Sequence, residues 1–138
     1  MRIAIIGAPR AGKTTLAEEI ARTSGCPLLH SDDLIALGWS AASAEIARVL
    51  HTTDDIIVEG VAVVRALRKA LASCSCAPVE RCIVLVRPRL QLTPRQLGMA
   101  RGIWTVLAEI EPELALRSVY LERYRDSEHY ALAQELQA

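Results

Sequence analysis

The sequence predicts an α/β fold, a three-layer α/β/α arrangement around a central parallel sheet of four strands, five at most. Short apolar runs rich in β-branched residues alternate with longer stretches whose apolar residues recur at helical spacing. Strands that alternate with helices are joined by right-handed crossovers and form a parallel sheet covered on both faces. A length of 138 residues with 51% apolar residues fits one core, so we expect residues 1–138 to form a single domain.

The first half of the chain predicts two strands and two helices. Residues 2–7 are apolar and end in glycine, which is typical of a buried strand. Residues 13–23 place their apolar side chains on one face and predict a helix, which Gly25 follows as a stop. Residues 26–30 predict a second strand, and residues 43–51 have a helical pattern.

The second half predicts strands over residues 56–58 and 82–86 and helices over residues 61–72 and 97–111. Pro112 is expected to end the last of these helices, because a proline ring clashes with the preceding helical turn. Residues 118–121 are a short apolar stretch among charged residues at helical spacing. We therefore expect residues 113–138 to be helical, without a fifth strand.

Composition and the chain start exclude several classes of protein. No uncharged stretch reaches the roughly 20 residues that span a bilayer, and residues 1–7 lead into a glycine rather than a signal-peptide cleavage site. We expect a cytoplasmic protein with no membrane partner, in which the cysteines are reduced thiols. The spacing of Cys74, Cys76 and Cys82 fits no common zinc motif, and no histidine lies near them in the sequence.

Charge is distributed unevenly although the formal net charge is zero. Residues 61–105 contain eight Lys or Arg and one Asp or Glu, while the segments on both sides are acidic. This pattern favours arginines that face an anion. The alternative is a solvated basic surface that pairs with acidic helices.

A phosphate-binding motif lies between the first predicted strand and helix. Residues 7–14 match G-x-x-x-x-G-K-[ST], in which loop amides and a helix N-terminus cradle phosphates. Lys13 is expected to reach the β- and γ-phosphates, and the Thr14 hydroxyl to coordinate Mg²⁺. The expected nucleotide-binding residues are Gly7, Ala8, Pro9, Arg10, Ala11, Gly12, Lys13, Thr14 and Thr15.

This motif resembles that of the P-loop (Walker A) NTPase superfamily, which implies a P-loop NTPase fold. The segment His30-Ser-Asp32-Asp33-Leu after the second strand resembles small P-loop kinases, including gluconate kinases, zeta toxins, chloramphenicol phosphotransferases and polynucleotide kinases. In those families an Asp at this place binds the acceptor or takes its proton. Shikimate kinases carry two Asp separated by one residue, and here His30 stands at the first position. Glu59-Gly60 is similar to the Glu-Gly of uridine-kinase-like enzymes.

The acidic residues are candidates for the chemistry of phosphoryl transfer, which requires an aligned acceptor and neutralised charge. Asp32 is the candidate base or acceptor-orienting group, and Thr14, Asp32 and Glu59 are candidate metal ligands. Asp33 and Gly60 join Asp32 and Glu59 as candidates for acceptor binding. The structural alternative is that these acids cap helix starts or bond backbone amides. We expect His30 to be a packed histidine with its hydrogen bonds satisfied.

Arginines of the basic segment complete the candidate site. Arg65 and Arg68 lie one helical turn apart and are expected to grip a phosphate or carboxylate of the acceptor. Residues 87–102 occupy the place of a kinase lid, and Arg95 and Arg101 are its candidate catalytic residues, supplying charge to the transition state. Two tryptophans, Trp39 and Trp104, are expected in the core rather than stacked on a base.

Together these features predict an ATP- and Mg²⁺-dependent kinase that transfers the γ-phosphate to a hydroxyl or phosphate of a small molecule or nucleotide, as a monomer or homodimer. Residues 60–138 contain no Asn-Lys-x-Asp guanine motif, so the sequence offers no support for GTP as the donor. One alternative is a polynucleotide 5′-hydroxyl kinase, favoured by the acidic pair and the basic segment. Another is a non-catalytic nucleotide-binding interaction module, favoured by the small size of the chain.

Overall fold

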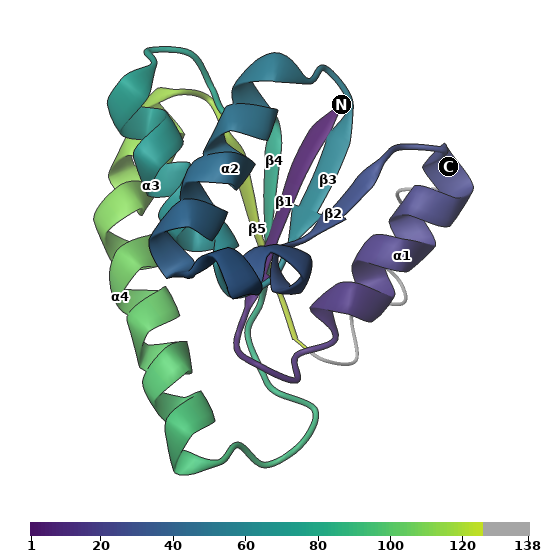
Figure 1. Ribbon diagram of the computed structural model, residues 1–138, viewed down its shortest axis with the longest axis vertical. Helices are drawn as coiled ribbons and strands as arrows, with labels where there is room; N and C mark the ends of the chain where they lie inside the picture. Colours follow the sequence, from purple (N-terminus) through teal and green to yellow (C-terminus); the bar gives the residue numbers. More distant parts are fainter. Residues whose placement is uncertain (126–138) are drawn as a thin grey trace.

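In the computed structural model, which describes residues 1–125, five parallel strands form one sheet in the order β2-β3-β1-β4-β5 (Figure 1). The strands are β1 (Arg2–Gly7), β2 (Leu28–His30), β3 (Ile56–Glu59), β4 (Arg81–Leu85) and β5 (Tyr120–Tyr124). The central strand, β1, is buried along most of its length because it pairs with β3 on one side and β4 on the other. The predicted α/β class is confirmed, and the sheet has five strands, the upper limit of the prediction.

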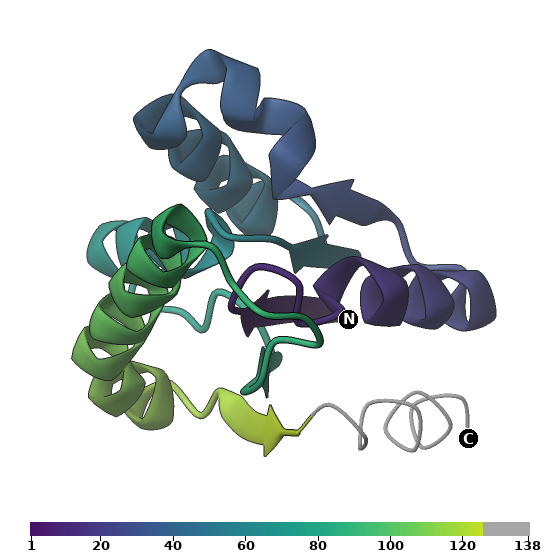
Figure 2. The same cartoon turned by 90° about the horizontal axis from the view of Figure 1, so that it is seen from below.

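Helices cover both faces of this sheet. They are α1 (Lys13–Ser24), the 3₁₀ helix η1 (Ser31–Leu37), α2 (Trp39–Thr52), α3 (Val63–Ser73) and α4 (Pro94–Leu116). Helix α1 lies on one face and α2, α3 and α4 lie on the other (Figure 2). Successive β1 side chains therefore enter different cores: Ile3 and Ile5 pack on the α1 side, and Ala4 and Ile6 on the other.

The fifth strand corrects the prediction of a helix over this part of the chain. Strand β5 pairs in parallel with β4, and Leu121 and Tyr124 pack against the cores on the two sides of the sheet, while Tyr120 is exposed and Glu122 is buried. Arg81 of β4 forms an ion pair with Glu122, which explains how a charged residue occupies an inward position. The predicted helix over residues 126–138 lies outside the described residues.

Helix α4 runs through Pro112 and ends four residues later, so the prediction that proline ends it was wrong. Leu114, which is 1% exposed, anchors the final turn in the core. The helix also begins earlier than residue 97, because Thr93 and Gln96 form a reciprocal capping box and Pro94 occupies the first turn.

The cysteines depart from the expectation of four reduced thiols. Cys74 and Cys76 form a disulfide with their Cα atoms 5.5 Å apart, a separation that disulfide geometry accepts. Cys26 and Cys82 are free, and burial raises the pKa of the Cys82 thiol to about 12.

The loops that follow β1, β2, β3 and β4 meet at the carboxyl edge of the sheet, the edge where ligands bind in open α/β folds. Two of these loops are joined directly, since the Arg89 amide donates to the Arg10 carbonyl at 2.7 Å. None of the helices within residues 1–125 combines the length and apolar character that crossing a membrane requires.

Candidate functional site

The loop between β1 and α1 curls around the side chain of Lys13. Gly12 has φ 88°, a left-handed conformation that glycine adopts without steric cost, and Arg10 takes the same region with φ 62°. The Lys13 ammonium donates to the carbonyl of Ala8 at 2.7 Å across the curl, and the residue is only 7% exposed. The motif therefore holds a buried cation beside a helix N-terminus.

Burial lowers the pKa of Lys13, because removing an ammonium from water disfavours its charged form. The carboxylates of Glu59 and Asp32 act in the opposite direction and raise this pKa. A bound anion such as a polyphosphate would add to the effect of these carboxylates, so the loop is suited to a ligand of high negative charge.

Glu59, at the end of β3, connects the loop to the neighbouring strand. The residue is 2% exposed, and its Oε1 atom accepts a hydrogen bond from Thr14 Oγ1 at 3.2 Å. The same oxygen lies 2.6 Å from His30 Nδ1. Thr14, Asp32 and Glu59 line one cavity, and a hydroxyl and two carboxylates are the hard oxygen donors that Mg²⁺ prefers. These three residues fit a magnesium site.

His30 is a satisfied histidine, as the sequence predicted. Its hydrogen bond to Glu59 raises the pKa of the imidazole, and the carboxylates of Asp33 and Glu18 contribute in the same direction. The Nε2 atom lies 3.9 Å from Glu18 on α1. His30 therefore links β2, β3 and α1 next to the phosphate loop.

Gly60 allows β3 and η1 to approach each other closely. Its φ of 126° is a conformation that residues with a Cβ rarely adopt, and a Cβ placed there would lie 1.8 Å from Ser31 Oγ. Ser31 is fully buried at this contact. The consequence is that Asp32, the next residue, lines the same cavity as Glu59.

A cavity of about 430 Å³, here called the phosphate-loop cavity, opens at this edge. It is lined by Pro9, Arg10, Ala11, Gly12, Lys13, Thr14, Asp32, Glu59, Gly60, Val61, Gln96 and Met99. Most of the predicted nucleotide-binding residues thus lie together with two of the predicted acidic residues.

A second cavity of about 540 Å³, here called the arginine cavity, adjoins the first. It is lined by Trp39, Val61, Arg65, Arg95, Gly98, Met99 and Ile103. Val61 and Met99 line both cavities, so the two cavities are direct neighbours that share these residues. The second cavity combines apolar walls with two guanidinium groups, a lining that suits a small molecule carrying a negative group.

Arg65 reaches from α3 toward α4. Its Nη2 atom lies 3.3 Å from where a Cβ would stand at Gly102, so the guanidinium rests against α4 where a side chain is absent. Among the described residues, neither Arg65 nor Arg95 pairs with a carboxylate. Two positive groups therefore face the arginine cavity without a protein counter-ion from residues 1–125.

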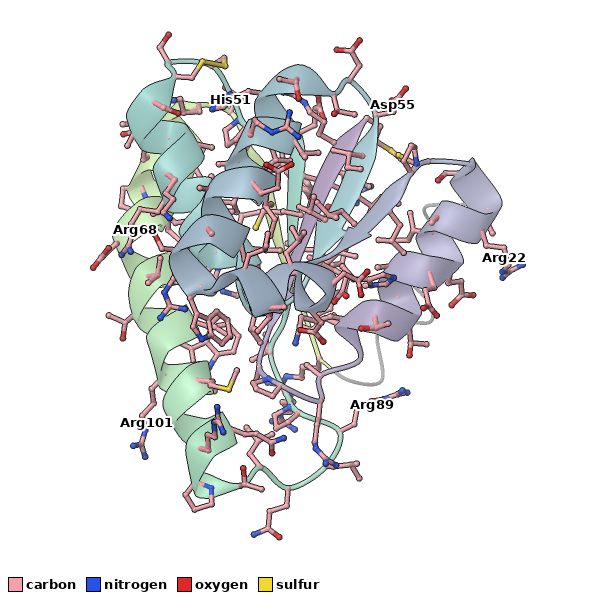
Figure 3. The ribbon with its side chains drawn as sticks, in the orientation of Figure 1. Arg22, His51, Asp55, Arg68, Arg89 and Arg101 are labelled. Atoms are coloured by element: carbon pink, nitrogen blue, oxygen red, sulfur yellow. A yellow bond between two sulfur atoms is a disulfide. The ribbon has the colours of Figure 1, made fainter. Side chains whose placement is uncertain are left out.

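The structure does not bring every predicted residue to these cavities. Gly7, Ala8, Thr15, Asp33, Arg68 and Arg101 line neither of them. The Ala8 carbonyl serves the loop by accepting from Lys13. Arg68 pairs with Glu109 at 3.3 Å on the surface, and Figure 3 shows Arg68 and Arg101 on the outer side of α3 and α4.

Several lining residues were missed by the sequence analysis. Trp39 was expected in the core, but it is 42% exposed and lines the arginine cavity at the start of α2. Gln96, Met99 and Ile103 lie on successive turns of α4. A signal for them in the sequence is the pair Gly98 and Gly102, four residues apart, where the missing side chains leave room beside the helix that Arg65 occupies at Gly102.

Comparison with known proteins finds solved structures that are similar to this chain. No protein-family model and no curated protein sequence matches the chain. The shikimate kinase of Aquifex aeolicus matches with a TM-score of 0.63 at 13% identity, over 99% of this chain and 93% of that one.

Two further shikimate kinases are similar. The enzyme of Acinetobacter baumannii, in complex with shikimate, matches with a TM-score of 0.57 at 16% identity, over 98% of this chain and 89% of that one. The enzyme of Bacteroides thetaiotaomicron matches with a TM-score of 0.51 at 16% identity, over 99% and 96% of the two chains. At this identity the likeness concerns the fold alone, and this chain shares the five-stranded parallel α/β fold of these shikimate kinases.

Proposed function

We propose that this chain is an ATP- and Mg²⁺-dependent kinase that phosphorylates a hydroxyl group of a small anionic molecule. The observation that carries the proposal is the junction of the two cavities at Val61 and Met99. The phosphate-loop cavity offers a site for the triphosphate, and the arginine cavity offers a site for the acceptor. A phosphoryl donor and an acceptor bound in two neighbouring cavities would meet the first requirement of the reaction.

On the donor side, the loop amides and Lys13 bind the phosphate oxygens of ATP. Thr14, Asp32 and Glu59 are the residues that would hold Mg²⁺, which when bound neutralises charge on the phosphates. Glu59 is already oriented for this role by its contacts with Thr14 and His30. The buried Lys13 remains close to the transferred group and stabilises the charge that develops on it.

On the acceptor side, Arg65 and Arg95 bind a carboxylate or phosphate group of the acceptor, and Trp39 and Ile103 contact its apolar part. This binding directs a hydroxyl of the acceptor toward the junction of the cavities. Asp32, an exposed carboxylate that lines the phosphate-loop cavity, accepts the proton of that hydroxyl.

The reaction then follows from these positions. A bond forms between the acceptor oxygen and the γ-phosphorus, the bond from that phosphorus to the β–γ bridging oxygen breaks, and ADP leaves. The hydroxyl proton passes to Asp32 and afterwards to solvent. The products are ADP and the phosphorylated acceptor, and no covalent enzyme intermediate is required.

The test incubates the purified full chain with γ-labelled ATP and Mg²⁺ against hydroxy acids, shikimate, sugar phosphates, nucleosides, nucleotides and 5′-hydroxyl oligonucleotides. We expect label on one class of small anionic acceptor. Asp32→Asn should lower kcat about 100- to 10,000-fold while the affinity for ATP measured without Mg²⁺ stays within about threefold. Asp33→Asn is the matched control, because this neighbouring carboxylate lines neither cavity.

Each other outcome contradicts the proposal in a different way. Label on oligonucleotides alone, with activity that falls steeply as salt rises, indicates a polynucleotide 5′-hydroxyl kinase. Tight ATP binding with no labelled product indicates a non-catalytic nucleotide-binding module. An Asp32→Asn enzyme with unchanged turnover removes the role given to Asp32.

A further inference from the structure

A second cluster of reactive side chains lies at the opposite edge of the sheet from the phosphate loop. It contains His51, near the end of α2, together with Cys74 and Cys76, which directly follow α3. One ligand atom from each of the three residues lies within 4.8 Å of the others. Figure 3 shows His51 next to the sulfur–sulfur bond, at the end of the molecule where β1 begins in Figure 1.

We infer that this cluster, with its disulfide reduced, binds a thiophilic metal ion of the kind represented by Zn²⁺. Two thiolates and one imidazole are a ligand set that zinc accepts. Tetrahedral zinc with bonds of about 2.0–2.3 Å places its ligand atoms roughly 3.5–3.8 Å apart. Since the three atoms already lie within 4.8 Å of one another, side-chain rotation alone brings them to that spacing.

The surrounding contacts hold the cluster in place. His51 Nε2 lies 3.0 Å from Ser73 Oγ, the kind of second contact that orients a metal-binding imidazole. Arg117, at the end of α4, donates to the carbonyls of Leu71 and Cys76, each at 3.0 Å, and to that of Cys74. One guanidinium therefore fixes the backbone on both sides of Cys74.

Two features of the sequence argue against a metal here: the cysteine spacing fits no common zinc motif, and no histidine lies near these cysteines along the chain. The fold removes the second objection by packing the end of α2 against the end of α3. Three protein ligands leave a fourth position of the ion for water, and the site is reachable because His51 and Cys76 are exposed and Cys74 is half-buried.

The disulfide and the metal exclude each other, because the same two sulfurs would form both. Converting the disulfide to two thiols takes up two electrons and two protons. In the experiment a phosphine supplies the electrons and becomes its oxide, and water supplies the protons and the oxygen. Zinc binding then displaces the two thiol protons and forms two sulfur–zinc bonds. The oxidised chain is therefore an internal control for the reduced one.

The experiment uses the full chain, reduced with a phosphine that is then removed without air, and titrates it with Co²⁺ and Zn²⁺. We expect one Co²⁺ per chain with a thiolate-to-metal absorption band, displaced by Zn²⁺. Cys76→Ser should lower the affinity about 100-fold and His51→Gln about 10-fold. Cys26→Ser is the matched control and should change nothing, because its thiol lies outside the cluster.

Absence of the thiolate band in the reduced chain overturns the inference, as does equal affinity in Cys76→Ser or in the oxidised chain. If a variant does not fold, the wild-type chain decides the matter by alkylation and peptide mass spectrometry. Zn²⁺ must then protect Cys74 and Cys76 from iodoacetamide and leave Cys26 reactive. Lack of that protection also overturns the inference.

Discussion

Half of the residues that line the phosphate-loop cavity are consecutive, from Pro9 to Thr14, whereas those of the arginine cavity come from α2, the β3–α3 turn, α3 and α4. The first set is positioned by the backbone conformation of one short loop. The second set is positioned by helix packing, as the contact of Arg65 with α4 at Gly102 illustrates.

This difference teaches which kind of site a single sequence reveals. A site formed by one loop carries its own pattern, because every residue in the loop must permit the same curl. A site formed by packed helices leaves only scattered residues, whose meeting depends on the whole fold. The following substitutions test whether the phosphate-loop cavity controls the binding of ATP and the arginine cavity controls the binding of the acceptor.

Among the changes that compare the two cavities, Lys13→Met in the phosphate-loop cavity is expected to have the largest effect. Loss of a charged hydrogen bond to the phosphates should lower ATP affinity about 100-fold. The melting temperature should not fall, because the change removes a buried charge whose pKa burial has already lowered. Calorimetry and thermal melting measure both quantities. Lys69→Met, at the half-buried lysine of α3, is the control, and unchanged ATP binding in Lys13→Met contradicts the proposed loop.

Gly60→Ala tests the backbone between the cavities. A Cβ there meets Ser31 and requires an unfavourable φ, so we expect a loss of about 2–3 kcal/mol in the free energy of unfolding. Gly98→Ala should act in the opposite direction, since it lies inside α4 with no atom near the added Cβ. Chemical denaturation of both variants measures the comparison. Equal stability of the two variants would refute the close contact.

Arg65→Met should affect the arginine cavity alone. With an anionic acceptor we expect KM for that acceptor to rise about 10-fold, because a charged hydrogen bond is lost, while KM for ATP stays within about twofold. Arg68→Met, one turn along the same helix and paired with Glu109, should leave both values unchanged. A rise in KM for ATP of similar size in Arg65→Met would show that the cavities are not separable.

The smallest effect concerns pH and His30. Its contact with Glu59 raises the pKa of the imidazole above the unfolded value of about 6.5, so the folded state binds the proton more tightly. The stability from this contact is fully present below that value and is lost as pH rises through the raised pKa. We expect His30→Gln to lose about 1 kcal/mol or less relative to wild type at pH 5.5 and to converge with it at high pH. A difference that is constant from pH 5.5 to 9 would contradict the ion pair.

The sequence predicted β1, the phosphate loop and α1 because local pattern and tertiary role agree there. It missed β5 because that strand is short and contains two adjacent charged residues, and because the pairing of Glu122 with Arg81 spans 41 positions. The prediction for Trp39 was wrong because the sequence around a tryptophan does not show whether its side chain packs in the core or lines a cavity at the surface. His51 reaches Cys74 and Cys76 only through the packing of α2 on α3.

The hydrogen bond from the Arg89 amide to the Arg10 carbonyl has a mechanical consequence. This one backbone hydrogen bond connects the phosphate loop to the segment that precedes α4, the helix that carries Arg95 and Met99. A displacement of the phosphate loop therefore either moves the segment before α4 with it or breaks this hydrogen bond.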